Sequence, residues 1–213
     1  MTRSSVPPPV TAVMDAASAW LPVRMAQVED RLAEVSAGYG PRLGEEAEAT
    51  LTAGGKRMRP LLVLMAAGEE AGERAVRVAS AVEMVHMATL VHDDVLDGAP
   101  VRRGRPTVVA RSGRDRAVGV GDLLFSRAFA ELAVGGGEAE VTELSSASVA
   151  LALGELAQRH DAFDTSITEE RYLDRCSLKT ARLFESACRL GRKQWIFRPH
   201  SFDQRRWRER VGS

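Results

Sequence analysis

The sequence predicts an all-α protein with a single domain, and three observations support this fold class. The chain of 213 residues is rich in Ala, Leu, Glu and Arg, which are good helix formers. Aromatic residues make up only 5% of it, and no segment alternates apolar and polar residues long enough to indicate a β-strand. Hydrophobic residues make up 45%, which is enough for a sizeable core. We therefore expect one helical bundle.

Glycine and proline mark the boundaries of the expected helices. Residues 1–9, which include three consecutive prolines, are expected to form a disordered tail. The helices expected after this tail span residues 10–37, 43–53, 59–70, 72–96, 114–134, 138–160 and 168–191. Glycines at 38, 54–55 and 135–137 separate several of them. Ser166 and Glu169 match a capping box at the start of the last helix.

The helix expected over 72–96 leads into a cluster of opposite charges. Three carboxylates and three guanidinium groups stand close together in the sequence: Asp93, Asp94, Asp97, Arg102, Arg103 and Arg105. Asp93 and Asp97 are one helical turn apart, and such close carboxylates suit a hard cation such as Mg²⁺. Arginine forks suit phosphate oxygens. The cluster predicts a magnesium–diphosphate site. A solvated helix end is the alternative, but the preceding run AVEMVHMATLV is too apolar for a surface helix and favours a cavity wall.

A second group of cations precedes another apolar helix. The segment GGKRMRP at 54–60 combines two glycines, which let the backbone approach a ligand closely, with Lys56 and Arg59. Pro60 fits the first turn of a helix, whose N-terminus attracts anions. Taken alone, the segment reads equally as a loop with solvated cations. Together with the acidic cluster, it predicts a second diphosphate pocket.

Four motifs occur together in this chain: GGKRMRP (54–60), HMATLVHDDVLDGAPVRRGRPT (86–107), GDLLFSRAF (121–129) and LKTARLFESACRLG (178–191). In their order and spacing they resemble the trans-isoprenyl diphosphate synthases, or polyprenyl synthetases, over about residues 10–191. The resemblance implies an isoprenoid-synthase-type helical bundle around a central cavity. It also implies a prenyltransferase that condenses isopentenyl diphosphate with an allylic diphosphate.

The resemblance assigns a role to each matching residue. It implies Mg²⁺ and allylic diphosphate binding by Asp93, Asp94 and Asp97, with Arg102 on the same diphosphate. It implies a clamp for isopentenyl diphosphate made of four residues: Lys56, Arg59, His86 and Arg103. Lys179 and Thr180 would stabilise the departing pyrophosphate. Without the resemblance, His86 reads as a hydrogen-bonded core residue and Lys179 as a surface lysine.

The resemblance also bears on product length. In this family the side chains about one turn before the first aspartate form part of the cavity floor, and Ala88 and Thr89 stand there. Small residues at this level favour products longer than farnesyl. The alternative is that Ala88 only allows close helix packing, and deeper residues such as Met84 block the channel.

The residues after Gly191 differ in composition from the preceding ones. Residues 192–213 hold seven Lys or Arg against two acidic residues, and two of the three Trp. We expect a basic, aromatic tail unrelated to the family, joined to a polyprenyl synthetase domain over 10–191 by a frameshift, a gene-model error or a natural split. A poorly ordered tail is the prediction, and an RNA- or membrane-binding arm is the alternative.

The family carries a second aspartate-rich motif that this sequence lacks, so the fold is expected to be incomplete at its C-terminus. Losing one charge interaction of about 4 kcal/mol would slow the reaction roughly a thousandfold. We therefore expect little activity from this chain alone, unless a complementing subunit restores it. A homodimer or a heteromer is expected. A non-catalytic diphosphate-binding subunit and a terpene cyclase are the other readings, and GGKRMRP argues against the cyclase.

Charge and hydropathy limit the remaining possibilities. The formal net charge is zero, which gives no argument for nucleic-acid binding. No apolar run approaches the roughly twenty residues of a membrane-spanning helix, and the N-terminus does not match a signal peptide. Cys176 and Cys188 lie about 18 Å apart along one expected helix, too far to pair. A cytoplasmic location is the expectation.

Overall fold

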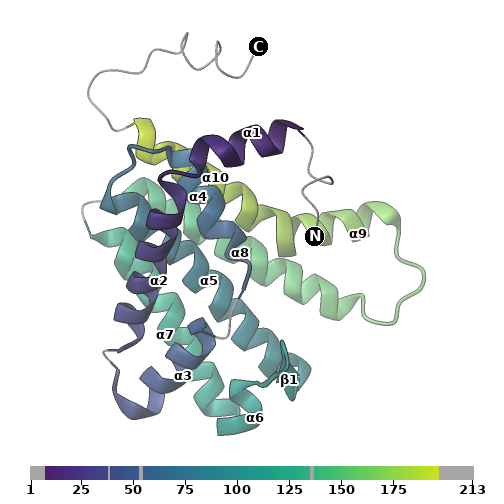
Figure 1. The fold of residues 1–213 in the computed structure, drawn as a ribbon. Helices are drawn as coiled ribbons and strands as arrows, with labels where there is room; N and C mark the ends of the chain where they lie inside the picture. Colours follow the sequence, from purple (N-terminus) through teal and green to yellow (C-terminus); the bar gives the residue numbers. More distant parts are fainter. Residues whose placement is uncertain (1–7, 38, 53–54, 135–136, 197–213) are drawn as a thin grey trace.

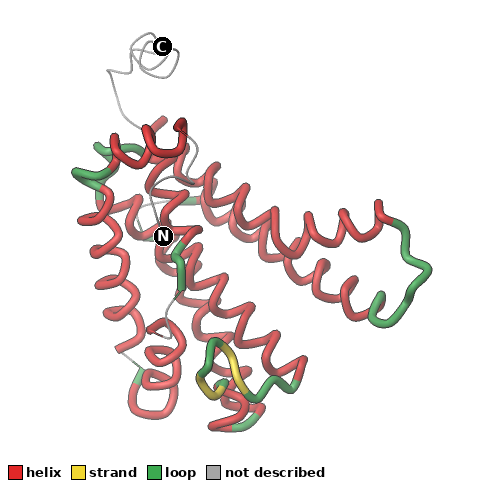
Figure 2. The backbone as a smooth tube through the Cα atoms, turned by 45° about the vertical axis from the view of Figure 1, so that its right-hand side comes forward, coloured by secondary structure: helices red, strands yellow, loops and turns green. Residues whose placement is uncertain are grey.

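The computed structural model describes residues 8–37, 39–52, 55–134 and 137–196. Within these ranges the chain is almost entirely helical, as Figure 2 shows. The helices are α1 (Pro8–Ala17), α2 (Leu21–Ala37), α3 (Gly40–Thr52), α4 (Met58–Ala67), α5 (Glu73–Asp97), α6 (Val108–Ser112), α7 (Arg114–Ala133), α8 (Glu138–His160), α9 (Glu169–Cys176) and α10 (Arg182–Ile196). A π-helical segment, η2 (Ser177–Ala181), joins α9 to α10, and β1 (Val101–Arg102) pairs with β2 (Arg105–Pro106) as an antiparallel hairpin. The predicted all-α fold class is confirmed.

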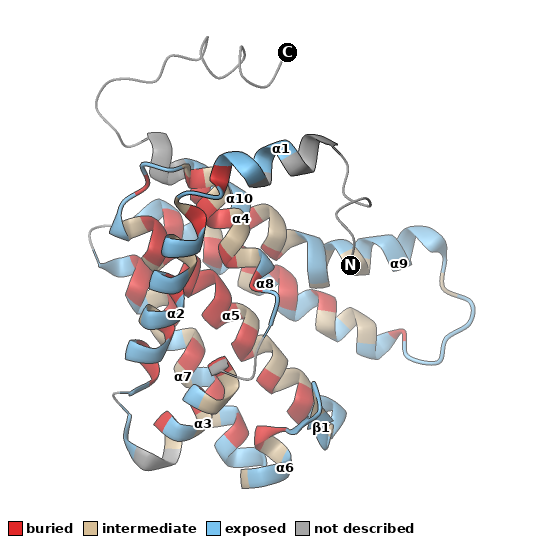
Figure 3. Ribbon diagram, viewed as in Figure 1, coloured by how far each residue is buried: buried red, intermediate tan, exposed pale blue. Residues whose placement is uncertain are grey.

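Helix α5 is the centre of the bundle. It packs against α2, α4, α7 and α10, and most of its length is buried (Figure 3). Ala79, Val82 and Val85 are fully buried, as expected for a helix that is apolar all round. Gly121 lets α7 approach α5 closely, because a Cβ atom there would lie 2.2 Å from Nε2 of His92. The acidic end of α5 is therefore held by packing on several sides.

The second half of α8 and all of α9 project from the bundle as a helical hairpin, the α8–α9 arm (Figures 1 and 2). Its α9 has no buried residue, and Leu153 and Leu156 of α8 are 52% and 64% exposed. From the far end of the arm the chain returns through η2 into α10, which packs on α4 and α8. The return path places η2 beside α8.

Several expected boundaries differ from those observed. The helix expected over 10–37 is two helices, because the chain turns at residues 18–20, where the Ser18 hydroxyl donates to the carbonyl oxygen of Asp15. The capping box with Ser166 and Glu169 was wrong, since Thr168 caps α9 by accepting from the Arg171 amide. Ser166 instead bonds to Asp164.

The two ends of the expected domain stay partly untested. Helix α10 continues to Ile196, so the boundary expected at residue 192 falls inside a helix. Most of the disordered tail expected at 1–9 lies outside the described residues, and so does most of the basic tail expected at 192–213. Gly38, Gly54 and the glycines at 135–136 lie outside them entirely. Among the described helices, none combines the length and the apolar character that crossing a membrane requires.

Candidate functional site

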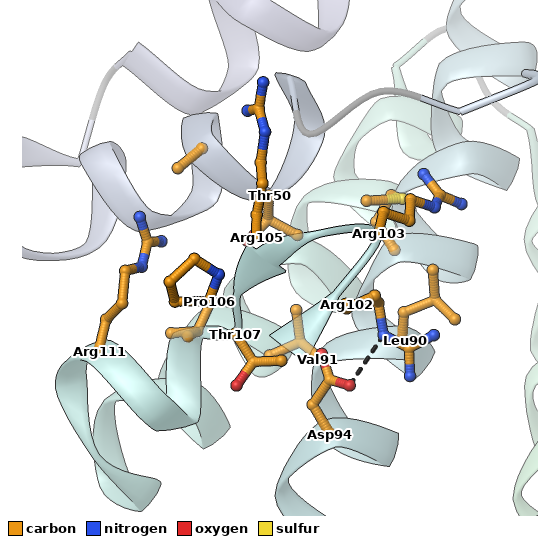
Figure 4. A pocket seen from close by; sticks show the side chains of 13 residues that line it. Thr50, Leu90, Val91, Asp94, Arg102, Arg103, Arg105, Pro106, Thr107 and Arg111 are labelled. Carbon is orange, nitrogen blue, oxygen red and sulfur yellow. Dashed lines mark hydrogen bonds and ion pairs between the residues drawn. The ribbon is translucent and has the colours of Figure 1, made fainter. Parts of the chain in front are cut away.

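Three cavities open around the C-terminal half of α5. The basic cavity, of about 360 Å³, is lined by Gly55, Lys56, Arg57, Arg59, Glu83, His86, Arg103 and Phe184, among others. The mixed cavity, of about 310 Å³, is lined by Thr89, His92, Asp93, Phe125, Leu151, Glu155, Leu156 and Lys179, among others. The hairpin cavity, of about 180 Å³, lies beside β1 and β2 and is lined by Leu90, Val91, Asp94, Arg102, Arg103, Arg105, Thr107 and Arg111, among others (Figure 4).

Arg57 builds the wall of the basic cavity. Its backbone is left-handed, with φ of 46°, and its side chain is only 8% exposed. Its guanidinium donates to Glu29 of α2 at 2.6 Å, to Glu83 of α5 at 2.8 Å, and to the carbonyl oxygen of Leu51. The charge of Arg57 is therefore balanced inside the protein, which makes this residue a structural tie between three helices.

The four residues of the predicted clamp converge on the basic cavity. The Arg59 guanidinium lies 4.3 Å from the centre of the Phe184 ring, and its buried Nε has no hydrogen-bond partner among the described residues. Burial lowers the pKa of Arg59, an effect that Glu83 opposes. Gly55 allows the hairpin to approach, because a Cβ atom there would lie 2.9 Å from Nη1 of Arg103. The lining of the cavity therefore holds four cationic side chains and one carboxylate.

His86 sits among these cations as a neutral ring. Burial, followed by the positive charges of Arg59 and Arg103, lowers its pKa to about 3. The imidazole is thus uncharged at neutral pH and offers one donor and one acceptor nitrogen. Burial is the larger cause of the lowered pKa, and the cations that add to it give the cavity a positive potential suited to an anion.

The hairpin between α5 and α6 separates Asp94 from the other two aspartates. Arg103, with φ of 51°, and Gly104, with φ of 76°, form its two-residue loop. Two positive φ values match the tight turns that suit the twist of a hairpin. The strand pairing brings Nε of Arg102 to 2.8 Å from Oδ1 of Asp94 (Figure 4). Asp94 is 5% exposed, and this burial raises the pKa of its carboxyl group. The hydrogen bond and positive charge of Arg102 oppose that rise.

Asp93 and Asp97 belong to the other side of α5. Asp93 lines the mixed cavity, where its Oδ2 lies 3.8 Å from Nζ of Lys179. Burial raises the pKa of Asp93, Lys179 opposes the rise, and the negative charges of Glu155 and Asp97 add to it. Oδ1 of Asp97 accepts a hydrogen bond from Arg159 of α8 at 3.0 Å. Like charges are crowded here, which a cation would relieve.

Close backbone contact positions Lys179. A Cβ atom on Gly154 of α8 would lie 2.5 Å from the backbone N of Lys179, so only glycine permits this approach of η2. The π-helical turn, a local widening often found at functional sites, carries Lys179 and Thr180. The Lys179 ammonium reaches into the mixed cavity and pairs with Glu155. Thr180 is exposed and lines none of the three cavities.

The acidic end of α5 fits magnesium through two aspartates. The expected set of three is not gathered, because pairing with Arg102 turns Asp94 into the hairpin cavity. No group of three acidic, His or Cys side chains among the described residues forms a ready metal cage. Asp93 and Asp97 share one face, and Mg²⁺ in proteins is commonly held by one or two carboxylates plus water and phosphate. These two residues therefore suit a metal that arrives with a diphosphate.

The two residues of the predicted cavity floor have different surroundings. Thr89 lines the mixed cavity, and its hydroxyl donates to the carbonyl oxygen of His86 at 2.7 Å. Ala88 is fully buried in the hydrophobic core and lines none of the three cavities. The structure therefore supports the alternative that Ala88 serves helix packing, and it leaves Thr89 in a position to contact a ligand chain.

The sequence model of the polyprenyl synthetase family matches residues 41–195. The chain belongs to the polyprenyl synthetase family. It is 43% identical over 170 residues to heptaprenyl diphosphate synthase component 2 of Geobacillus stearothermophilus, covering 78% of this chain and 53% of that relative. It is 42% identical over 141 residues to octaprenyl diphosphate synthase of Escherichia coli, covering 64% and 43%. The chain thus spans about half the length of the curated relatives it matches.

Solved structures of polyprenyl synthetases share the fold. A polyprenyl synthase from Caulobacter crescentus, complexed with calcium and isoprenyl diphosphate, superposes with a TM-score of 0.80 at 33% identity. The match covers 92% of this chain and 59% of that one. A decaprenyl diphosphate synthase from Rhodobacter capsulatus gives 0.79 at 36% identity, covering 86% and 56%. The predicted isoprenoid-synthase fold is confirmed.

Some residues of the site in this member of the polyprenyl synthetase family were not found from the sequence. Glu155, which lines the mixed cavity, lies in α8, whose sequence reads as an ordinary helix. Arg159, which pairs with Asp97, lies in the same helix, and Phe184 of the basic cavity lies in α10. One signal was present, because a glycine inside a helix, such as Gly154, often marks a close backbone approach. Neither the partner of that approach nor the pairing of Glu155 with Lys179 follows from the sequence, since both depend on the path of η2.

Proposed function

We propose that this chain binds isopentenyl diphosphate and an allylic diphosphate for a Mg²⁺-dependent prenyl transfer. The observation that carries this proposal is the pairing of two unlike cavities along α5. His86 in the basic cavity and Asp93 in the mixed cavity are two turns apart on one face of the helix. That spacing is about 10 Å along the helix axis. At such a distance, one diphosphate group can bind in each cavity while the carbon chains of the two substrates meet between them.

The two cavities suit different diphosphates. The basic cavity offers Lys56, Arg59 and the Arg103 guanidinium to an anion, with the neutral His86 as a further hydrogen-bonding group. It suits isopentenyl diphosphate without a metal. The mixed cavity offers Asp93 at its edge and apolar walls from Phe125, Leu151 and Leu156. It suits an allylic diphosphate whose charge is met by metal and whose hydrocarbon enters the apolar part.

The reaction needs charge neutralisation more than a nucleophile. The allylic carbon–oxygen bond ionises, the isopentenyl double bond attacks the allylic cation, and loss of a proton restores an alkene. Magnesium held by Asp93 and Asp97 would supply charge neutralisation to the diphosphate. Lys179 would donate hydrogen bonds to the departing pyrophosphate, since its ammonium already lies in the mixed cavity. The apolar walls would keep water from the cation.

The product is proposed to be longer than farnesyl. This rests on the relatives, which make heptaprenyl and octaprenyl diphosphates by name. It also rests on Thr89 at the wall of the mixed cavity, because its small side chain leaves space that a bulky aromatic side chain at position 89 would fill. Ala88 is not part of this argument because it faces the core.

A role as one subunit of a heteromer is the second candidate. The Geobacillus relative is a synthase component by name, which favours a partner chain. This candidate role predicts diphosphate binding with little turnover by the chain alone. A terpene cyclase is disfavoured, because it needs no second cation-lined cavity beside the acidic motif. A cytoplasmic location is part of the proposal, supported by two free cysteines, Cys176 and Cys188.

Isothermal titration tests the proposal with isopentenyl diphosphate and with a non-ionising thiodiphosphate analogue of an allylic substrate. We expect binding of the allylic analogue to need Mg²⁺. In an Asp93→Asn/Asp97→Asn variant its affinity should fall at least about tenfold, because each charged contact contributes about 1.5–3 kcal/mol. Isopentenyl diphosphate should bind the same variant normally. Asp174→Asn, on exposed α9, is the control. Metal-independent binding of the allylic analogue that ignores both aspartates would refute the proposal.

A further inference from the structure

Lysine is rare in this chain, and its placement is informative. The sequence holds 29 Lys and Arg together, yet lysine stands only at positions 56, 179 and 193. Lys56 lines the basic cavity and Lys179 lines the mixed cavity, while the side chain of residue 193 is outside the described structure. Arginine supplies nearly every structural ion pair, so a lysine at 179 answers a local requirement that arginine does not meet.

The requirement is visible in the surroundings of the Lys179 ammonium. It pairs with Oε2 of Glu155 and lies 3.8 Å from Oδ2 of Asp93, so it stands between two carboxylates from different helices. An ammonium is a compact charge that fits such a gap, whereas a guanidinium is planar and broad. The Glu155 side chain is only 12% exposed, so its carboxylate has little access to water.

The pairing of Glu155 is incomplete. Its other oxygen, Oε1, is buried without a hydrogen-bond partner, although it forms an ion pair with Nε of Arg159 at 3.5 Å. The same carboxylate raises the pKa of the neighbouring Asp93. Glu155 thus pairs with two cations and lies near a second carboxylate, with part of its hydrogen-bonding capacity unused. Buried polar groups are usually satisfied, so this exception asks for an explanation.

The backbone fixes the two partners against each other. Gly154, which directly precedes Glu155, allows η2 to come within reach, because a Cβ atom at Gly154 would lie 2.9 Å from Cα of Lys179. The close approach therefore fixes the position of the Lys179 backbone relative to Glu155, whose carboxylate accepts from the lysine ammonium.

We propose that Glu155 is a positioning residue that holds the Lys179 ammonium in the mixed cavity of the unliganded protein and then competes with pyrophosphate for it. This inference rests on the proposed diphosphate site and adds a regulator of how tightly that site retains its product. When a diphosphate takes the ammonium, the Glu155 carboxylate is left near an anion in a poorly solvated place. Glu155 therefore weakens pyrophosphate retention and favours its release.

The first arm of the test needs no ligand. Proton–nitrogen NMR of lysine ammonium groups, at one fixed pH, reports an ammonium that is held in an ion pair. With only three lysines, Lys179→Met assigns the signal. We expect the Lys179 signal to be lost in Glu155→Gln and retained in Glu143→Gln. Glu143 is a matched control because it lies in α8, is 15% exposed, and bonds to Ser186 of α10.

The second arm measures pyrophosphate affinity by titration at constant Mg²⁺. Removing a neighbouring negative charge should tighten pyrophosphate binding by Glu155→Gln about tenfold, whereas Glu143→Gln should leave it within twofold, roughly. Glu155→Asp keeps the charge but withdraws it by one methylene group, and it should fall between wild type and Glu155→Gln. Thermal melts of all variants check that each is folded.

The outcomes separate the two proposals. An unchanged Lys179 signal in Glu155→Gln would overturn the positioning role, whatever the affinities are. Unchanged or weaker pyrophosphate binding by Glu155→Gln, with normal binding by wild type, would overturn the competition. A wild-type chain that binds neither diphosphate nor pyrophosphate would refute the proposed function and the competition with it, while the NMR signal would still decide the Glu155–Lys179 contact.

Discussion

If the proposed function holds, the basic cavity and the mixed cavity would bind a diphosphate in opposite ways. In the basic cavity, Lys56 and Arg59 face a neutral His86, and the one acidic lining residue, Glu83, is occupied by Arg57. In the mixed cavity, the Lys179 ammonium is already paired with Glu155 and close to Asp93. The lining of the basic cavity is mainly cationic, whereas the lysine of the mixed cavity is already paired with a carboxylate of the protein.

This difference predicts how each site responds to its ligand. An anion entering the basic cavity can contact Lys56 and Arg59 while the pair of Arg57 with Glu83 stays intact. An anion entering the mixed cavity must compete with Glu155 for Lys179, or bring a metal to Asp93. The first site therefore suits a substrate that is to be held, and the second suits a group that must later leave.

The largest expected effect is at Arg59. Replacing it with glutamine removes two or more charge-assisted hydrogen bonds to a diphosphate, each of about 1.5–3 kcal/mol. Isopentenyl diphosphate affinity should fall by more than about a hundredfold in a titration.

Lys179→Met should weaken binding of the allylic analogue only about tenfold, because the Lys179 ammonium is already paired with Glu155 in the unliganded protein.

Arg111→Gln is the control for Arg59. This residue lines the hairpin cavity and pairs with Glu46, so isopentenyl diphosphate affinity should be unchanged. Equal losses at Arg59 and Arg111 would mean that the basic cavity is not the binding site and that the contrast between the two cavities is mistaken.

A smaller effect is expected at Gly154, where the mixed cavity depends on backbone contact. Gly154→Ala places a Cβ atom 2.5 Å from the backbone of Lys179, so η2 must shift. Overpacking of this kind costs about 1–3 kcal/mol and lowers the melting temperature by about 2–4 °C per kcal/mol in a chain of this size.

Gly119→Ala is the matched control in α7, because a Cβ atom there would meet only a Leu43 methyl group at 3.7 Å. Alanine is the better helix former, so this variant should be neutral or slightly stabilised. A Gly154→Ala protein as stable as Gly119→Ala would show that η2 is not held by close contact.

The smallest effect concerns acid stability and the basic cavity. The folded protein keeps His86 neutral down to a pKa of about 3, whereas the unfolded chain protonates it near the ordinary value of 6.5. The unfolded state thus binds more protons between these values, so this stabilising contribution is full above pH 6.5 and is lost as the pH falls. It amounts to about 1–2 kcal/mol between pH 7 and pH 5.

Urea unfolding of wild type and His86→Gln at pH 7 and pH 5 measures this contribution. The variant should lose less stability on acidification than wild type. His160→Gln, at an exposed position at the end of α8, should behave like wild type. Identical pH dependence in all three proteins would contradict a neutral, cation-surrounded His86.

The sequence predicted the residues of the basic cavity better than those of the mixed cavity. Lys56 and Arg59 stand in one short motif, and His86 lies on a strongly apolar helix, so local pattern was enough to select them. Glu155 carries no such mark, because its importance comes from a lysine 24 positions away that a π-helical turn brings across.

The same distinction applies to the fold. Apolar periodicity located α5, α7 and α8 to within a few residues, since each is a long helix with clear boundaries. The break at residues 18–20, the two-residue hairpin and the π-helical turn were missed. Each of these is set by tertiary contacts, such as the pairing of Arg102 with Asp94, which outweigh local preference.

The left-handed backbone at Arg57 and Arg103 has a consequence for the order of events in ligand capture. Non-glycine residues adopt this conformation at a cost, so it persists only where surrounding bonds enforce it. Both arginines flank the basic cavity, and Arg57 is enforced by its contacts to three helices. The wall of the basic cavity formed by these residues is therefore preorganised in the unliganded protein, so an anion can bind without a large rearrangement of this backbone.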